Sequence, residues 1–457
     1  MTLLAPKVAA AKAVGSLVRA AGRGGGTSLP GKVLTRLEPH AIGLLAQRLT
    51  HGSAVISATN GKTTTAAMTA AILERSGETL VHNRAGANMA GGVASALAAA
   101  ARRGGRELSG ELGLFEVDEF WLAPVVEELE PRALLLGNLF RDQLDRYGEL
   151  EIIADRWAAV VAAHGDRSAL VLCADDPLVA DLGRAHEPLY FGVDDDSLAY
   201  AELQHAADSK HCRRCGHPYV YEAIYLAHLG RYRCPSCGSR RPDPAVVARA
   251  VELRGIHSAA FTLATPAGSA RVELPLPGLY NVYNALGAAA LGLSLGASLA
   301  AVVAGLEAVA PAFGRAETVE LAGRPASILL VKNPAGANEV LRTLALEGGE
   351  LDILGVLNDR IADGRDVSWV WDADWELLAG SVRAMTCAGT RAAELALRMK
   401  YAGADPARLR VVEQPEAALD AAVAAGTGPL YILPTYTALL ELRDLLAERG
   451  QAEEYWR

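Results

Sequence analysis

The residues with the clearest chemical meaning form the run Ala58–Thr65, which reads Ala-Thr-Asn-Gly-Lys-Thr-Thr-Thr. It follows an apolar, strand-like run and precedes an alanine-rich stretch of helical character at residues 66–75. A strand, a glycine turn and a helix bring backbone N–H groups and a helix N-terminus together, and both attract phosphate oxygens. We therefore expect a nucleotide-phosphate loop here, with nucleotide contacts from Asn60, Gly61, Lys62, Thr63 and Thr64.

Within this loop, Lys62 is expected to reach the terminal phosphates, and the hydroxyl of Thr63, or else that of Thr64, is expected to ligate Mg²⁺. The usual G-x-x-x-x-G-K-[ST] pattern is shortened, because Ile56 stands where its first glycine would be. The alternative is a plain strand–turn–helix with a solvated lysine.

A second set of chemical groups closes the apolar run at residues 112–117, which is followed by Asp118 and Glu119. Ligands of open α/β sheets bind at the carboxyl ends of strands. Glu116 is therefore predicted to bind Mg²⁺ beside the phosphate loop. For Asp118 and Glu119, a solvated strand end is an equal alternative.

Four cysteines form two C-x-x-C pairs, with eighteen residues between the pairs: Cys212, Cys215, Cys234 and Cys237. This spacing is typical of a zinc ribbon, in which four thiolates bind Zn²⁺ tetrahedrally and leave no open position for a substrate. A structural Zn²⁺ is therefore expected, with His211 and His217 as bystanders. A redox pair is the competing interpretation.

An acidic loop, residues 358–372, packs four aspartates into fourteen residues and includes Trp369 and Trp371. Taken by itself, it is an acidic surface loop with aromatic anchors. Cys173 and Cys387 each end an apolar run without a G-x-C-x-G-type turn, so they are expected to be core residues rather than nucleophiles.

The elements around these groups predict an α/β protein. Strand-like and helical stretches alternate over residues 51–312 and again over 315–457, which predicts two units with mostly parallel sheets, the second of them Rossmann-like. Residues 205–241 interrupt the first alternation as the zinc-ribbon insertion. Residues 1–50 are expected to form helices that dock on the protein, although a membrane-surface helix is an alternative.

Composition limits the location and the partners. The net charge of −9 without a long basic run argues against nucleic acid as a partner. No cleavable signal is visible, which predicts a cytoplasmic protein with reduced cysteines. Residues 285–306 carry no charge, but Gly296-Ala297-Ser298 predicts a helix stop and a new N-cap, hence two buried helices rather than a membrane span.

The phosphate loop resembles that of the Mur ligase family, and further motifs occur in that family's order. They are the stretch 138–149 (Asn-Leu-Phe-Arg-Asp-Gln-Leu-Asp-Arg-Tyr-Gly-Glu), the G-x-x-N-x-x-N stretch at 278–284, Phe313-Gly314-Arg315, Lys332-Asn333-Pro334-Ala335-Gly336 and the acidic loop. Together they resemble the MurT branch. The resemblance implies a Mur-type ATPase unit and adds nucleotide contacts from Asn138, Asn281 and Arg315.

The same resemblance implies an activity. It is the ATP-dependent amidation of the D-isoglutamate α-carboxylate in the lipid II stem peptide, through an acyl phosphate, at the inner face of the membrane. Ammonia would come from a GatD-like glutaminase partner, and the membrane would be met only through the lipid-linked substrate. Asp366, or failing that Asp363, would complete the partner's Cys-His pair. Glu116 is the third residue expected to act in catalysis, through the Mg²⁺ at the phosphate loop.

Two departures and two alternatives remain. Gln143 replaces a metal-binding His of ordinary Mur ligases, and between Lys62 and Lys332 the only lysine is Lys210, beside the first C-x-x-C. No residue is therefore available for the carbamylated lysine of peptide-adding Mur ligases. The alternatives are a Mur or folylpolyglutamate-type ligase that adds an amino acid, and a non-catalytic nucleotide-binding zinc scaffold.

Overall fold

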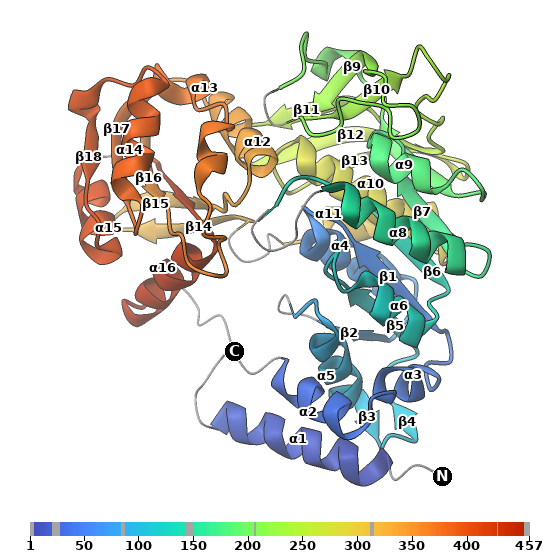
Figure 1. Ribbon diagram of the computed structural model, residues 1–457. Helices are drawn as coiled ribbons and strands as arrows, with labels where there is room; N and C mark the ends of the chain where they lie inside the picture. The colour runs from blue at the N-terminus through green and yellow to red at the C-terminus, as the bar shows by residue number, and fades with distance from the viewer. Residues whose placement is uncertain are drawn as a thin grey trace.

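The computed structural model describes residues 4–20, 28–83, 87–142, 150–204, 207–310, 315–426 and 428–451. Within these ranges, no helix is both long enough and apolar enough to span a membrane. Figure 1 shows helices at the N-terminus, a large central sheet and a second sheet with its own helices to one side.

The central sheet has the strand order β13-β12-β11-β8-β7-β6-β1-β5-β2 among the described residues. All neighbours from β11 to β2 pair in parallel, as the alternating pattern predicts. The antiparallel pairs β11–β12 and β12–β13 were not predicted. The strands are β1 (Ser53–Ser57), β2 (Leu80–His82), β5 (Leu112–Glu116), β6 (Ala133–Leu136), β7 (Ala169–Cys173), β8 (Leu189–Val193), β11 (Val246–Arg254), β12 (Ser258–Thr265) and β13 (Gly268–Leu274).

Helices cover both faces of this sheet, because its strands are apolar on both sides. The uncharged stretch 285–306 forms two helices with Ser298 as the N-cap of the second, as predicted; the first is buried, whereas the second buries only one face, through Val302, Gly305 and Leu306. Gly305 lets the second of them approach α4, since a Cβ there would lie 2.8 Å from the backbone nitrogen of Ile72. The helices are α4 (Lys62–Arg75), α5 (Ala90–Ala100), α6 (Leu122–Leu129), α8 (Leu150–His164), α9 (Pro177–Leu182), α10 (Leu279–Ser294) and α11 (Leu299–Glu307).

The N-terminal helices α1 (Leu4–Ala20), α2 (Leu29–Leu37) and α3 (Ala41–Ala46) dock on the protein, as expected for residues 1–50. Gly31 of α2 lies so close to α5 that a Cβ would meet the carbonyl oxygen of Gly91 at 1.9 Å. Lys7 also pairs with Glu38 at 2.9 Å. A short hairpin of β3 (Ala101–Arg102) and β4 (Glu107–Leu108) follows α5.

The insertion lies between β8 and β11. Its hairpin, β9 (Val220–Leu226) and β10 (Leu229–Arg233), pairs apart from the central sheet. The turn of the hairpin reaches inward, because His228 is fully buried and its ring lies 4.8 Å from that of Phe140. The insertion is therefore packed against the loop that follows β6.

The C-terminal sheet has the order β14-β15-β19-β16-β17-β18. Its strands pair in parallel except β14 with β15, an antiparallel pair that the sequence pattern did not reveal. The elements are β14 (Arg315–Leu321), β15 (Arg324–Leu329), β16 (Leu351–Val356), β17 (Val382–Ala388), β18 (Leu409–Val411), β19 (Leu430–Pro434), α12 (Pro334–Ala345), α13 (Glu376–Ala379), α14 (Ala392–Tyr401), α15 (Pro415–Ala424) and α16 (Tyr436–Glu448).

Candidate nucleotide-binding and active site

The turn between β1 and α4 requires a glycine. Gly61 is the N-cap of α4 and has φ 84°, a left-handed conformation that side chains disfavour. A Cβ at Gly61 would also lie 1.9 Å from Oδ1 of Asn284. Because α4 begins at Lys62, four residues before the predicted helical stretch, Thr63 and Thr64 lie in its first turn, where the backbone N–H groups point toward the N-terminal end of the helix and suit an anion.

Lys62 is held inside the loop. Its ammonium lies 2.7 Å from Oε2 of Glu119 and donates to the carbonyl oxygen of Ala58 at 2.5 Å. Burial alone would lower the pKa of Lys62, but the carboxylates of Glu119 and Asp118 outweigh it and raise the pKa. Lys62 is therefore a cation at neutral pH, and it lies where it would offset the negative charge of bound phosphates.

Glu119 and Asp118 are not a solvated strand end. Asp118 is buried, and the side chain of Glu119 is only 11 % exposed. Burial raises the pKa of Glu119, but the positive charges of Lys62 and Lys332 prevail and lower it, so Glu119 is ionised. Of the two alternatives weighed for this pair, the structure supports a position inside the site.

Glu116 lies beside Thr63. The Thr63 hydroxyl donates to Oε1 of Glu116 at 3.1 Å, and the amide of Asn88 approaches the same oxygen at 3.3 Å. Asn83 fixes the end of the strand, because it accepts from the Glu116 N–H at 2.9 Å and donates to the Glu116 carbonyl at 2.7 Å. A hydroxyl and a carboxylate side by side are the hard oxygen ligands that Mg²⁺ prefers, so this pair fits the predicted Mg²⁺.

Two asparagines brace the loop from opposite sides. Asn138 accepts from the Asn60 N–H at 2.9 Å and donates to the Asn60 carbonyl at 3.0 Å, so it supports the loop backbone. From the C-terminal sheet, Asn333 donates to the Asn60 side chain at 3.0 Å and also caps α12 through the Gly336 N–H. Both units therefore meet at Asn60.

A second lysine approaches from the C-terminal unit. Lys332 pairs with Asp142 at 2.6 Å and lies 3.4 Å from the carbonyl oxygen of Thr59. The sequence stretch around Lys332 was singled out by its resemblance, but no contact with the phosphate loop was predicted. The site is thus built at the junction of the two sheets.

A cavity of about 120 Å³ opens next to the phosphate loop. Asn60, Gly61 and Thr64 line one side, and residues of α12 line another. Asn284 lines it, whereas the predicted base contact Asn281 is 2 % exposed and donates to the Pro277 carbonyl. Asn281 also accepts from the Asn284 amide at 3.0 Å, so it orients Asn284; its own contact with a nucleotide stays a prediction.

Two predicted positions lie outside the described residues. The side chain of Arg315 is one, although its backbone begins β14. Gln143 and the residues up to Glu149 are the other. Lys210, the only other lysine of this region, is exposed in the insertion and not in the site.

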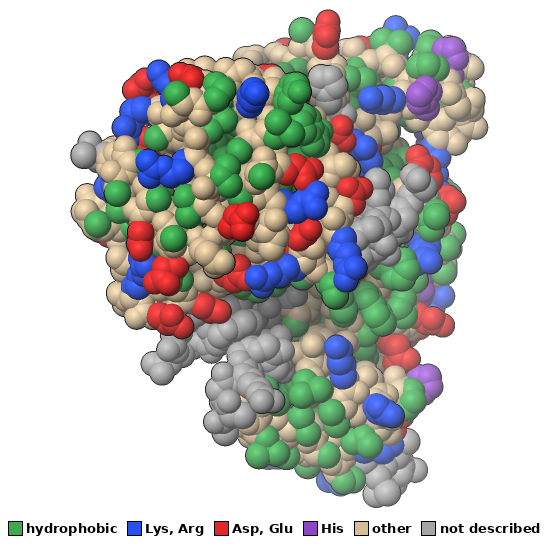
Figure 2. Space-filling view, turned by 60° about the vertical axis from the view of Figure 1, so that its left-hand side comes forward, with side chains coloured by type: hydrophobic (Ala, Val, Ile, Leu, Met, Phe, Trp, Pro, Cys, Tyr) green, Lys and Arg blue, Asp and Glu red, His purple; other side chains and the backbone are tan. Residues whose placement is uncertain are grey.

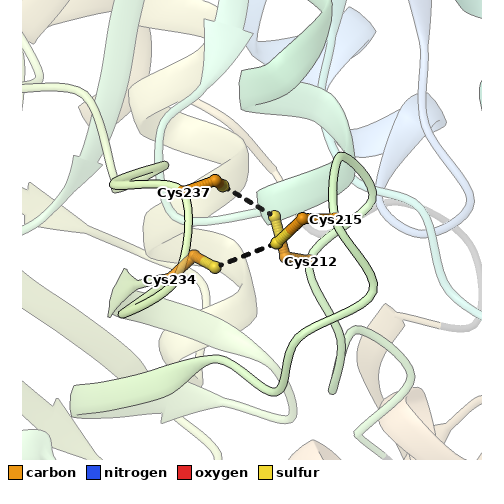
Figure 3. A group of neighbouring side chains, drawn as sticks. All are labelled: Cys212, Cys215, Cys234 and Cys237. Carbon is orange, nitrogen blue, oxygen red and sulfur yellow. Dashed lines mark hydrogen bonds between the residues drawn. The ribbon is translucent and has the colours of Figure 1, made fainter.

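The four cysteines predicted to bind zinc come together (Figure 3). Sγ of Cys212 lies 3.6 Å from that of Cys237, and Sγ of Cys215 lies 3.5 Å from that of Cys234. In a tetrahedral site with Zn–S bonds of about 2.3 Å, sulfur atoms are separated by about 3.8 Å. The glycine after each pair has φ near 70°, as the tight turns require. The residues therefore fit a structural Zn²⁺.

Asp363 and Asp366 of the acidic loop differ in how far they are buried. Asp363 is 5 % exposed and accepts from the Thr437 N–H at 2.7 Å, so it is used inside the protein. Asp366 is exposed, and hydrogen bonds from Ser368 lower its pKa. Of the two predicted candidates for a partner's catalytic group, Asp366 is the accessible one.

The same unit exposes large apolar side chains. Figure 2 shows hydrophobic side chains scattered among charged ones over this face, and Ile361, Trp371, Leu397 and Tyr401 are each more than 40 % exposed. Cys173 and Cys387 are buried, and burial raises the pKa of Cys387 to about 12. They are core residues, as expected.

The sequence did not predict a role in the site for Asn284 or Glu339, and it left the position of Glu119 undecided. Glu119 follows a strand already assigned to the site, so its position was a usable signal. Asn284 lies one helical turn after Asn281 and could have been paired with it. Glu339 lies within a helix of another unit, and no sequence signal links it to the loop.

Family models match both units. The Mur ligase middle domain matches residues 56–233, and the MurT ligase C-terminal domain matches residues 330–439. The subunit MurT of lipid II isoglutaminyl synthase (glutamine-hydrolyzing) from Streptococcus pneumoniae is 32% identical over 433 residues, which cover 93% of each chain. The subunit of the same name from Staphylococcus aureus is 32% identical over 92% of this chain and 93% of its own.

Solved structures share the fold. A pseudomurein peptide ligase type C from Methanothermus fervidus has a TM-score of 0.68 at 22% identity, over 89% of this chain and 80% of its own. Folylpolyglutamate synthase from Mycobacterium tuberculosis has a TM-score of 0.61 at 17% identity, over 92% of this chain and 98% of its own. At these identities, the likeness establishes the Mur ligase fold and nothing further.

Proposed function

Because the chain belongs to the MurT family, we propose that it is the ATP-dependent ligase subunit of a glutamine-hydrolysing lipid II isoglutaminyl synthase. It would convert the D-isoglutamate α-carboxylate of the lipid II stem peptide into D-isoglutamine. A GatD-like glutaminase would supply ammonia, and the lipid-linked substrate would bring the chain to the inner face of the membrane.

One arrangement carries this proposal. A phosphate loop with Lys62 and the Thr63–Glu116 pair meets Lys332 of a unit that matches the MurT ligase C-terminal domain, and that unit exposes Asp366. The first part supports phosphoryl transfer from a nucleotide. The second part supports a partner that needs a carboxylate from this chain.

In the reaction we propose, an oxygen of the substrate carboxylate attacks the γ-phosphorus of ATP, the bond to the β-phosphate oxygen breaks, and ADP leaves. Lys62 would offset charge on the transferring group together with the backbone N–H groups of the first turn of α4. Arg315 is a further candidate by resemblance. Glu119 would keep Lys62 in place until the phosphates arrive.

Thr63 and Glu116 would hold Mg²⁺, which would neutralise negative charge on the phosphates of the nucleotide. Cys212, Cys215, Cys234 and Cys237 would hold a structural Zn²⁺. Both assignments rest on the donor sets and the distances given above.

The second step would consume the acyl phosphate. Ammonia attacks its acyl carbon, the carbon–oxygen bond to phosphate breaks, and the nitrogen loses a proton to leave a neutral amide. Asp366 of this chain would orient a histidine of the partner and stabilise its protonated form, as a carboxylate does beside a nucleophile–His pair. Its exposure and its lowered pKa suit that role.

Addition of an amino acid is the other reaction that this fold supports. The position of the lysines argues against the version that uses a carbamylated lysine, because Lys62 and Lys332 are paired with carboxylates and Lys210 lies at the insertion surface.

The test is amidation of lipid II by the purified chain with ATP and Mg²⁺, with mass spectrometry of the product. Three nitrogen sources are compared: ammonium alone, glutamine alone, and glutamine with a GatD-like glutaminase. Product with ammonium or with the partner, but not with glutamine alone, is the expected result. Addition of a whole amino acid to a precursor in place of amidation would overturn the proposal.

A further inference from the structure

Glu339 is a carboxyl group with no partner. It lies in α12, 2 % of the residue is exposed, and in the described part of the chain neither Oε1 nor Oε2 has a hydrogen-bond partner. A buried polar group without a partner costs stability, so its retention calls for an explanation.

Arg342, one helical turn along α12, does not pair with Glu339. It donates to the carbonyl oxygens of Tyr225 at 3.0 Å and of Leu198 at 3.2 Å, and its guanidinium stacks over the ring of Tyr200. Lys332 also lines the cavity that Glu339 faces, but it pairs with Asp142 at 2.6 Å. Within the described residues, Glu339 therefore has no ion pair.

Glu339 lines the cavity next to the phosphate loop. Much of the remaining lining is apolar. It comes from the loop after β6, from the hairpin β9–β10 and from the C-terminal unit: Phe140, Leu226, Leu229, Leu329, Leu330 and Val340. Asn60, Gly61 and Thr64 of the phosphate loop line the same cavity. A nucleotide with its phosphates at the N-terminus of α4 would thus extend its base into an apolar space that holds one unpartnered carboxyl group.

We propose that Glu339 binds the amino edge of the adenine base of the nucleotide. The inference rests on the proposed use of ATP and names the residue that would contact the base. The contact would be two parallel hydrogen bonds, from the 6-amino group of the base to one carboxyl oxygen and from the other oxygen to ring N1.

This pairing requires the neutral carboxylic acid, which has one donor and one acceptor. An ionised carboxylate has acceptors only and would instead match the two adjacent donors of guanine. Burial without a cation in contact favours the acid, and it raises the pKa of Glu339 to about 7 against the opposing effect of Arg342. Purine riboside has a hydrogen atom at position 6, so it lacks the amino group, keeps ring N1 and would lose one of the two hydrogen bonds.

The experiment is equilibrium binding of ATP, purine riboside triphosphate and inorganic tripolyphosphate to the full chain with Mg²⁺, by competition with a fluorescent ATP analogue. The variants are Glu339→Gln, which keeps one donor and one acceptor, and Glu339→Leu, which has neither. Glu448→Leu, at an exposed glutamate of α16, is the matched control for loss of a carboxylate. Thermal melting of each variant monitors folding.

The wild-type chain should prefer ATP to purine riboside triphosphate. Glu339→Gln should keep this preference, whereas Glu339→Leu should bind ATP about tenfold more weakly, with its tripolyphosphate affinity unchanged. A ratio of ATP affinity to purine riboside triphosphate affinity in Glu339→Leu that equals the wild-type ratio overturns the inference. A wild-type chain that binds no ATP overturns it and the proposed function together. ATP selectivity that depends on Glu339, without lipid II amidation, supports it and refutes the proposed function alone.

Discussion

The ammonium of Lys62 lies 2.7 Å from Oε2 of Glu119, and only 9 % and 11 % of the two side chains are exposed. The phosphate loop therefore carries its own counterion. Phosphates that enter the loop must compete with Glu119 for Lys62. Since the pair is almost enclosed, its loss leaves a poorly solvated charge rather than a water-exposed one.

The first prediction concerns this pair. Glu119→Gln should destabilise the protein by about 3 kcal/mol, because the ammonium of Lys62 keeps its charge but loses its main partner. Added ATP with Mg²⁺ should then raise the melting temperature of the variant more than that of the wild type, since the phosphates replace the missing negative charge. Differential scanning fluorimetry with and without nucleotide measures both effects.

Glu107→Gln is the control, because Glu107 pairs with Arg103 at the surface, where 76 % and 51 % of the two side chains are exposed. Exposed ion pairs contribute little to stability, so this variant should have the same melting temperature as the wild type. Equal nucleotide-induced shifts in Glu119→Gln and the wild type would show that Glu119 does not compete with phosphate.

Local patterns predicted much of the fold. The apolar runs at 133–136 and 169–173 have the bounds of β6 and β7, because each run lies between turn residues and is buried on both faces. The two cysteine pairs predicted their own cluster, since ligand spacing reflects the knuckle turns. Glycine and serine at 296–298 marked the break between α10 and α11.

Contacts between distant segments could not be predicted in the same way. Lys332 and Asp142 are 190 residues apart, and no periodicity relates them. Glu339 looks like any helix glutamate until the two units are brought together. The choice between Asn281 and Asn284 is also tertiary, because the close approach of Gly61 to Asn284 decides which amide lies at the loop.

The second prediction is a pH dependence that arises from Glu339. Its pKa is raised from 4.5 to about 7 in the folded chain, so the folded state binds this proton more tightly than the unfolded state. The resulting stability is present in full below about pH 4.5 and is lost as the pH rises through about 7. Relative to Glu339→Gln, which has no such proton, the wild type should lose about 3 kcal/mol as the pH rises across this range.

Urea denaturation of the two proteins across this pH range measures the difference. Other titrating groups are common to both proteins, so they cancel in the comparison. Parallel stability profiles would mean that Glu339 titrates in the folded chain as it does in the unfolded one.

The third prediction concerns the cysteine cluster. Cys237→Ser should lose bound zinc and should also bind ATP about tenfold more weakly. The reason is that Leu226 and Leu229, which line the cavity, belong to the hairpin β9–β10, and Cys234 and Cys237 directly follow β10. Metal analysis and nucleotide titration measure the two effects.

His217→Ala is the matched control, since His217 is exposed beside the first cysteine pair and is predicted to be a bystander. It should keep both its zinc and its ATP affinity. A Cys237→Ser protein that lacks zinc yet binds ATP as the wild type does would show that zinc in the insertion does not support ATP binding at the cavity.

The last prediction distinguishes Asp366 from Asp363. Asp366→Asn should reduce glutamine-dependent amidation in the presence of a glutaminase partner at least tenfold while amidation with ammonium is unchanged, because the exposed carboxylate would act only on the partner's histidine. Its melting temperature should match the wild type. Asp363→Asn should instead melt earlier, by the equivalent of about 1–3 kcal/mol, since Asp363 accepts hydrogen bonds from the Thr437 N–H and hydroxyl in a buried position. Loss of ammonium-dependent amidation in Asp366→Asn would place this carboxylate in the ligase reaction itself and refute its role toward a partner.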